Sequence, residues 1–278
     1  MAWILPGSDG NPVMQHKAIL ATSLGFSRTF NSRNIEFPWY ALWDQKLSDL
    51  VADVPHLIVT PQFPVWFVPP DDHEDEKGGA PGRQADDDDE EAWAGDTSFA
   101  STIPAKRAKS VVVDFVILNL GAVAQPEYKR NFRYKGWRIT AASIGLLVEV
   151  KRFVCRSLKG QEQKAEILRR VTEAKGDLLN QAAHIFVQDP KRDSVLAIAA
   201  AGPYWSSTTI RRTNVTKKIH GLSVGDPDYQ ATSERPSDTV PHWNAVLRVD
   251  LARSSDRLHT IYKSLKKMND DLDKPADV

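Results

Sequence analysis

Three charged side chains interrupt two strongly apolar segments in the middle of the chain. Asp114 lies within KSVVVDFVILNL (109–120), and Glu149 and Lys151 lie within GLLVEVKR (145–152). Alternation along a strand puts Glu149 and Lys151 on the same face. A charge on a buried face is costly unless it is paired or bound to something. These residues therefore form either a structural ion pair or part of a catalytic site.

The catalytic interpretation requires a metal ion. If the two segments are neighbouring strands, the carboxylates of Asp114 and Glu149 can converge, as in sites for Mg²⁺ or Mn²⁺. A water polarised by such an ion is a nucleophile near neutral pH. Lys151 would orient or deprotonate that water, or stabilise charge on a phosphate. The alternative is a surface charge pair worth about half a kilocalorie per mole.

The surrounding sequence predicts the elements that would position these residues. Trp39, Trp43, Leu47, Leu50 and Val54 have helical spacing, and Pro38 suits a first helical turn. We predict helices over residues 34–54, 159–186 and 254–272. We predict strands over residues 56–70, 109–120, 145–154, 194–205 and 243–252. The order is thus helix, three strands, helix, strand, and then a last strand and a helix. This order is typical of an α/β or mixed α+β fold with a central mixed sheet.

Several local details follow from turn and capping residues. Pro61 and Pro64 predict one or two short strands rather than a long one. Gly176 predicts a break or kink within the helix of residues 159–186. Ser254 or Ser255 is the expected cap of the last helix. The stretch 206–240 is polar and is expected to be rich in loops, after a strand that ends at Gly202-Pro203.

The pattern Asp…Glu-x-Lys in this order of elements resembles the PD-(D/E)XK nuclease superfamily, which has the restriction-endonuclease-like fold. Asp114-Phe115, LLVEVKR, NQAAHIF (180–186) and LAIAAAGPYW (196–205) resemble a group of fungal proteins assigned to that superfamily. The resemblance covers about residues 34–210. It implies a metal-dependent phosphodiesterase that cuts DNA or RNA.

The resemblance also implies roles for individual residues. Asp114 and Glu149 match the metal-binding acids, assisted by the backbone carbonyl of Val150, and Lys151 matches the catalytic lysine. Gln181 resembles a glutamine that supports the site from the following helix in a subset of these nucleases. Many members add an acid from the first helix, for which the candidates are Asp44, Glu36 and Asp49, with Asp44 preferred because it neighbours the apolar positions of that helix.

Two departures weaken the resemblance. Val113 stands where the superfamily name has proline, and the step of 35 residues from Asp114 to Glu149 is long. The intervening sequence must therefore contain an insertion. Neither departure removes a catalytic group.

The charge distribution indicates a polyanionic partner. Residues 71–96 hold twelve of the chain's 36 acidic side chains and two of its 36 basic ones. The remainder has 34 basic and 24 acidic side chains, which suits DNA or RNA. We expect nucleic-acid contacts from a segment of aromatic and basic residues and from the end of the motif strand. The segment could instead be a hairpin with one packed aromatic face. The expected contact residues are Lys129, Arg130, Arg133, Lys135, Arg138 and Arg152.

The predicted domain organisation is simple. We expect a flexible lead over 1–33, one nuclease-like domain over 34–252 with a disordered acidic insertion at 71–102, and an amphipathic helix and tail over 253–278. No apolar run is long enough to span a membrane. The single cysteine, Cys155, excludes an internal disulfide and fits a reducing intracellular location.

Rival motifs are weaker. GLSVG around Ser223 matches G-x-S-x-G, but its neighbours do not suit a nucleophile elbow. His184 could reach the site beside Gln181, although a partly buried packing role is commoner. The alternative function is a catalytically inactive nuclease-fold protein that binds nucleic acid, or a protein-interaction module that uses the acidic segment.

Overall fold

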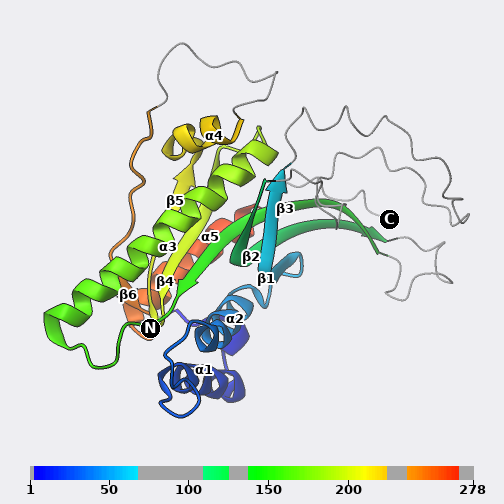
Figure 1. The fold of residues 1–278 in the computed structure, drawn as a ribbon. Helices are drawn as coiled ribbons and strands as arrows, with labels where there is room; N and C mark the ends of the chain where they lie inside the picture. Colours follow the sequence, from blue (N-terminus) through cyan, green and yellow to red (C-terminus); the bar gives the residue numbers. More distant parts are fainter. Residues whose placement is uncertain (1–2, 68–108, 125–136, 224–236, 269–278) are drawn as a thin grey trace, which may run out of the picture.

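A computed structural model describes residues 3–67, 109–124, 137–223 and 237–268. These residues form a mixed α/β fold with a six-stranded sheet of order β1-β2-β3-β4-β5-β6 (Figure 1). The elements are η1 (Pro6–Ser8), α1 (Pro12–Phe26), α2 (Phe37–Val51), β1 (Leu57–Phe67), β2 (Lys109–Ala124), β3 (Trp137–Lys151), α3 (Gly160–Gln188), β4 (Ser194–Ala201), β5 (Tyr204–Arg211), η5 (Arg212–Asn214), α4 (Thr216–Ser223), β6 (Leu247–Arg248) and α5 (Ala252–Lys267).

The sheet combines antiparallel and parallel pairing. β1, β2 and β3 are consecutive antiparallel neighbours. β3 pairs with β4 in parallel, and α3 makes the crossover connection that a parallel pair requires. β4, β5 and β6 continue antiparallel. The mixed sheet predicted from the sequence, and the order of helix, three strands, helix and strand from α2 to β4, are confirmed.

Helices cover both faces of the sheet. α3 runs across the strands on one side, and α5 lies behind them in Figure 1. Gly145 of β3 permits the close approach of α5, since a Cβ atom there would lie 2.8 Å from Leu265 Cδ2. The buried side chains of all these elements form one hydrophobic core. The C-terminal helix is thus packed into the same core as the predicted domain.

The apolar stripe predicted for α2 is buried. Trp39 and Trp43 are fully buried, and Pro38 lies in the first turn. The indole Nε1 of Trp43 donates to the carbonyl of Gly202 at 2.9 Å, at the turn between β4 and β5. The ring of Trp43 also meets Trp205 edge to face, with centroids 6.2 Å apart. These contacts attach α2 to the far strands of the sheet.

Several local predictions are wrong. α3 continues through Gly176, because that residue is exposed and no neighbour within 4 Å requires a change of direction. Residues 206–240 contain most of β5 and all of α4 rather than loops alone. The last strand, β6, is only two residues long. The polarity of its serines and threonines concealed β5, although most of its residues are of types that favour strands and it is largely buried.

The chain before α2 and the start of α5 also differ from expectation. Residues 12–26 form α1 instead of a lead without regular structure, and α1 packs against α2. β1 is one strand despite Pro61 and Pro64, which an edge strand tolerates. Ser254 does not cap α5. It is buried within the first turn and accepts a hydrogen bond from Trp205 Nε1 at 2.8 Å.

Two predicted segments lie outside the described residues: the acidic insertion (71–102) and most of the aromatic and basic segment. Among the helices that the structure describes, none combines the length and the apolar character needed to cross a membrane.

Candidate active site

The candidate site lies where β2 and β3 part. Their pairing ends at Phe115 and Val148. Beyond that point the remainder of β2 pairs with β1, and the last residues of β3 pair with β4. Asp114 and Glu149 are the next residue on each strand, so they face each other at the opening. We call this region the fork, defined by Asp114, Glu149 and Lys151 and the side chains that contact them.

Asp114 replaces the missing strand pairing. Its Oδ2 accepts a hydrogen bond from the backbone N–H of Val150 at 2.8 Å. Its Oδ1 accepts from the hydroxyl of Tyr40 at 2.5 Å and from Nε2 of Gln62 at 3.2 Å. The Asp114 carboxylate is therefore held by α2, β1 and β3 at once, which fixes its position.

Glu149 is buried beside this carboxylate. Its Oε2 accepts from Gln181 Nε2 at 2.8 Å, and its Oε1 accepts from Lys151 Nζ at 2.6 Å. Burial, and then the negative charge of Asp114, raise the pKa of Glu149 to about 7, although Lys151 and Gln181 act in the opposite direction. The fork thus holds two acids that disfavour each other's charge.

Lys151 bridges Glu149 and Asp177. The distance from its Nζ to Asp177 Oδ2 is 2.7 Å, with Asp177 about half exposed on α3. Burial acts to lower the pKa of Lys151, but the hydrogen bonds to Asp177 and Glu149 raise it above its usual value. Lys151 is therefore an ammonium at neutral pH, suited to orienting a water or stabilising negative charge rather than to removing a proton.

Gln181 joins α3 to both strands of the fork. Besides Glu149, its Nε2 donates to the carbonyl of Val112 on β2 at 3.2 Å. Its Oε1 is buried and has no hydrogen-bond partner among the described residues. This helical glutamine thus supports the fork, at the position that the sequence indicated, and leaves one acceptor unused within the site.

Of the three candidate acids at or near α2, Glu36 adjoins the fork and Asp44 does not. Glu36 precedes α2, and its Oε1 accepts from Tyr40 at 3.1 Å. Burial and the charge of Asp114 raise the pKa of Glu36. Asp44 is exposed on α2, and Asp49 is buried elsewhere, bonded to Gln45 at 2.8 Å. The preference for Asp44 relied on apolar neighbours, which locate a core face but not a site.

Sequence reasoning missed three residues of the fork: Tyr40, Gln62 and Asp177. Asp177 precedes Gln181 by one helical turn, and that spacing could have revealed it. Gln62 lies between two prolines on β1 with a φ of 50°, a conformation rare outside glycine. Tyr40 belongs to the face of α2 that also carries the apolar stripe. No sequence pattern marks Gln62 or Tyr40 as a residue of the site.

The predicted nucleic-acid contacts are only partly described. Arg152 is exposed directly after β3, and its backbone N–H bonds the carboxylate of Glu36. The backbone of Arg138 pairs with Val123, far along β3 from the fork. The other four predicted basic contacts lie outside the described residues: Lys129, Arg130, Arg133 and Lys135.

The two rival motif residues lie in packing positions. The Nδ1 of His184 lies 2.9 Å from the carbonyl of Asn180, and its ring lies against Phe67, with centroids 5.8 Å apart. Ser223 is buried at the end of α4, not on a turn between a strand and a helix. Neither residue supports a catalytic role.

The fork's donor set fits a divalent cation. No group of three histidine, cysteine, aspartate or glutamate side chains arranged to hold a metal occurs in the described part of the chain. Mg²⁺, however, is usually held by one or two carboxylates together with waters. Asp114 and Glu149 supply two carboxylates, and positive charge between them would relieve the repulsion that raises the pKa of Glu149.

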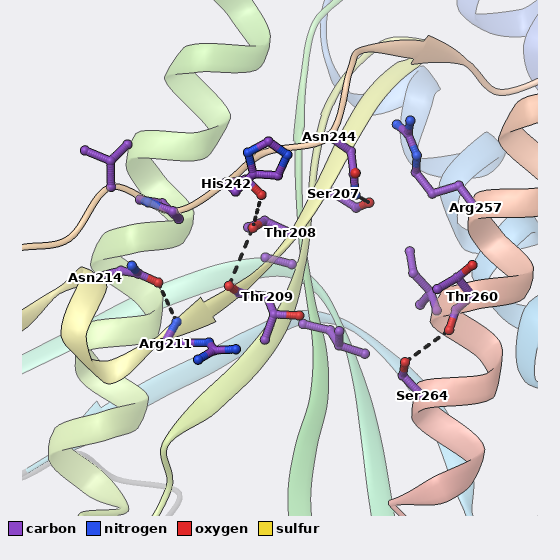
Figure 2. A pocket seen from close by; sticks show the side chains of 15 residues that line it. Ser207, Thr208, Thr209, Arg211, Asn214, His242, Asn244, Arg257, Thr260 and Ser264 are labelled. Carbon is purple, nitrogen blue, oxygen red and sulfur yellow. Dashed lines mark hydrogen bonds between the residues drawn. The ribbon is translucent and has the colours of Figure 1, made fainter.

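A separate groove of about 520 Å³ lies between α5 and the segment 240–244 (Figure 2). Hydroxyl groups of β5 line it and bond to main chain, as Thr208 Oγ1 does to the carbonyl of His242 at 2.8 Å. Arg211 and Arg257 also line it, and none of its lining residues is acidic. We call this region the β5 groove. It lacks the carboxylates that the predicted chemistry requires.

Comparison of the chain with protein-family models, with curated proteins and with solved structures finds no match.

Proposed function

We propose that the protein is a metal-dependent nuclease of restriction-endonuclease-like fold, which hydrolyses phosphodiester bonds of DNA or RNA at the fork. The observation that carries the proposal is the convergence of Asp114, Glu149 and Lys151 where β2 and β3 part. The order of elements from α2 to β4 and the helical Gln181 agree with it. The proposal rests on this geometry together with the sequence resemblance.

The chain's own residues would divide the work. Asp114, Glu149 and the backbone carbonyl of Val150 would hold Mg²⁺ or Mn²⁺, which would supply a polarised water and neutralise phosphate charge. Tyr40 and Gln62 hold the Asp114 carboxylate, and burial and the Asp114 charge raise the pKa of Tyr40, so its hydroxyl remains a donor.

The ammonium of Lys151 would lie beside the scissile phosphate and stabilise its developing negative charge. Asp177 and Glu149 hold that ammonium from two sides. Hydrolysis breaks the bond from phosphorus to the leaving sugar oxygen. The water oxygen replaces that oxygen on phosphorus, so the products are a phosphate monoester and a hydroxyl.

One observation favours the alternative, a protein of this fold that binds nucleic acid without cutting it. Each carboxylate of the fork already accepts hydrogen bonds from within the protein, and Lys151 already neutralises one negative charge. Such a module predicts binding that weakens steeply with salt, and no cleavage.

A cleavage assay separates these functions. We expect the purified protein to cut DNA or RNA with added Mn²⁺ or Mg²⁺ and to stop when a chelator is added. The variant Lys151→Ala should be at least about a hundredfold slower, because the charge beside the phosphate is lost. A Lys151→Ala protein as fast as wild type would refute this mechanism. Salt-sensitive binding without any cleavage would favour the module.

A further inference from the structure

A second pocket opens beside the fork and is rich in arginine. It has a volume of about 450 Å³, and its walls come from residues 32–34, residues 152–157 and α3. Four arginines and one carboxylate, Glu166, line it. We call it the arginine pocket, after Arg33, Arg152, Arg156 and Arg170. Arg170 is paired with Glu166 at 3.2 Å and with Glu173 at 3.1 Å, so the pocket's excess positive charge comes from the other three.

The arginine pocket and the fork share a wall. Arg152 directly follows Lys151, and Asn34 lies two residues before Glu36. The Nδ2 of Asn34 donates to the carbonyl of Phe153 at 2.7 Å and to that of Val154 at 3.0 Å, which ties the two walls together. The position of the pocket relative to the end of β3 is therefore fixed.

α3 gives the separation of the two sites. Arg170 lines the pocket, and Asp177, seven residues later on the same helix, contacts Lys151. Seven residues are two turns, so both lie on the same side of α3, about 10 Å apart along its axis. The two sites are therefore close enough for one short nucleic-acid strand to reach both.

Polar atoms in the pocket walls are unused. Arg156 is held in place because its Nη2 donates to the carbonyl of Asn31 at 2.7 Å and to that of Gly25 at 3.3 Å. Its Nε is buried and lacks a hydrogen-bond partner among the described residues, as does the Oδ1 of Asn34. These two atoms are closed off from solvent, so the groups that a ligand would meet are the exposed guanidinium groups of Arg33 and Arg152, whose N–H groups suit phosphate oxygens.

We propose that the arginine pocket binds the terminal phosphate of a nucleic-acid strand whose backbone then enters the fork. This inference rests on the proposed function and makes cleavage end-directed, with the cut at a short, fixed distance from the end. The chemistry that would recognise the ligand is a phosphate monoester, which carries up to two negative charges near neutral pH. An internal phosphodiester carries one negative charge and cannot enter a partly closed pocket end-on.

The test compares matched oligonucleotides, as DNA and as RNA, with a 5′-phosphate, a 3′-phosphate, no phosphate or a closed circle. With chelator present, we expect one phosphorylated end to bind at least about tenfold more tightly than the hydroxyl end, a preference that the double variant Arg33→Ala/Arg152→Ala should lose. The double variant removes side chains only, so the backbone N–H of Arg152 can still contact the carboxylate of Glu36. Arg253→Ala, an exposed arginine of α5, is the control and should keep the preference.

Cys155 gives a second measurement on the unaltered protein. It is the chain's single cysteine, it is exposed, and it lines the arginine pocket. The preferred phosphorylated oligonucleotide should slow the alkylation of Cys155 by N-ethylmaleimide, whereas the unphosphorylated one should slow it much less. Equal protection by both, or by neither, would overturn the inference.

Failure of the inference and failure of the proposed function give different results. If the protein cuts circular, unphosphorylated and phosphorylated substrates equally fast with metal, the nuclease proposal stands and the arginine pocket is not an end-binding site. If it binds a phosphorylated end selectively but never cuts, the pocket proposal stands and the nuclease proposal fails. Neither selective binding nor cleavage would refute both.

Discussion

The fork and the β5 groove are both polar regions beside the sheet, yet they differ in how their polar groups are satisfied. In the groove, hydroxyls of β5 bond to the covering segment: Thr208 Oγ1 donates to the carbonyl of His242 at 2.8 Å, and Ser207 Oγ accepts from Asn244 Nδ2 at 3.2 Å. In the fork, Asp114 and Gln181 bond to main-chain groups where β2 and β3 have separated. The groove is an intact sheet edge covered by another segment. In the fork, side chains take the place of a neighbouring strand as hydrogen-bond partners of the main chain.

That difference distinguishes polar groups that stabilise the fold from polar groups that are suited to a reaction. The hydroxyls of the groove are neutral and paired, so the fold gains from burying them. The fork instead holds two acids whose proximity raises the pKa of Glu149 to about 7, which costs folding free energy at neutral pH. A pKa shifted by burial and by a neighbouring charge is typical of functional sites.

The largest expected effect is on catalysis. Asp114→Asn keeps the shape of the side chain but removes a charge needed for the metal, so cleavage should fall at least about a thousandfold. Ser264→Ala in the β5 groove should leave the rate unchanged. The measurement is the rate of oligonucleotide cleavage with Mn²⁺. Equal rates for wild type and Asp114→Asn would remove the functional distinction between the two regions.

The second expected effect is on pH dependence. The folded state holds the Glu149 proton more tightly than the unfolded state does. Without metal, the free energy of unfolding should therefore fall by on the order of 2 kcal/mol as the pH rises from about 5 to about 8. Burial and the charge of Asp114 raise the pKa of Glu36 too, which acts in the same direction.

Urea unfolding at several pH values measures this effect. Added Mn²⁺ should restore the lost stability at the higher pH, because the ion compensates the two negative charges. Glu149→Gln should flatten the pH dependence, and Ser264→Ala should leave it unaltered. Burial lowers the pKa of His56 and His184, which acts in the opposite direction in both proteins, so the comparison of the two is decisive. A Glu149→Gln variant with the same pH dependence as wild type would contradict the electrostatics assigned to the fork.

Gln181 should show an intermediate effect on both activity and stability. Gln181→Ala leaves the carbonyl of Val112 and one oxygen of Glu149 without their donor, which should cost about 1–3 kcal/mol of folding free energy. Cleavage should slow by about tenfold, because Glu149 loses its orienting contact. Chemical denaturation and steady-state kinetics measure the two quantities. Asn180→Ala, an exposed neighbour on α3, is the control and should change neither by a similar amount.

The smallest expected effect belongs to the groove. Thr208→Val removes the hydrogen bond to the carbonyl of His242 and should lower the free energy of unfolding by about 1 kcal/mol. Its cleavage rate should equal that of wild type. A large loss of activity in Thr208→Val, with stability preserved, would show that the groove takes part in function.

Sequence patterns predicted the framework because its signals are local. β-Branched runs indicated β2 and β3, helical spacing indicated α2, and E-x-K on an apolar strand placed Glu149 and Lys151 on one face. Gln181 was singled out by its resemblance to the helical glutamine of some PD-(D/E)XK nucleases rather than by a local pattern. The prediction that Asp114 lies next to Glu149 needed only that consecutive strands pair, which is the commonest arrangement.

The remaining features depend on tertiary contacts. Tyr40 reaches Asp114 across 74 positions of sequence, and Gln62 does so through an unusual backbone conformation between prolines. Neither contact has a periodic signature. Glu36 adjoins the fork because it lies at the start of α2 beside Tyr40, whereas Asp44 is exposed further along the helix. The N-terminal helix α1 was missed because its polar and apolar residues do not separate onto opposite faces.

The central claim is that the fork binds a divalent cation between Asp114 and Glu149. A crystal of the protein soaked in Mn²⁺ tests it directly, through the anomalous difference density of the ion. The account predicts a peak coordinated by one oxygen of Asp114 and one of Glu149, with Lys151 nearby. A crystal that takes up Mn²⁺ elsewhere but shows no peak at these two carboxylates would contradict it.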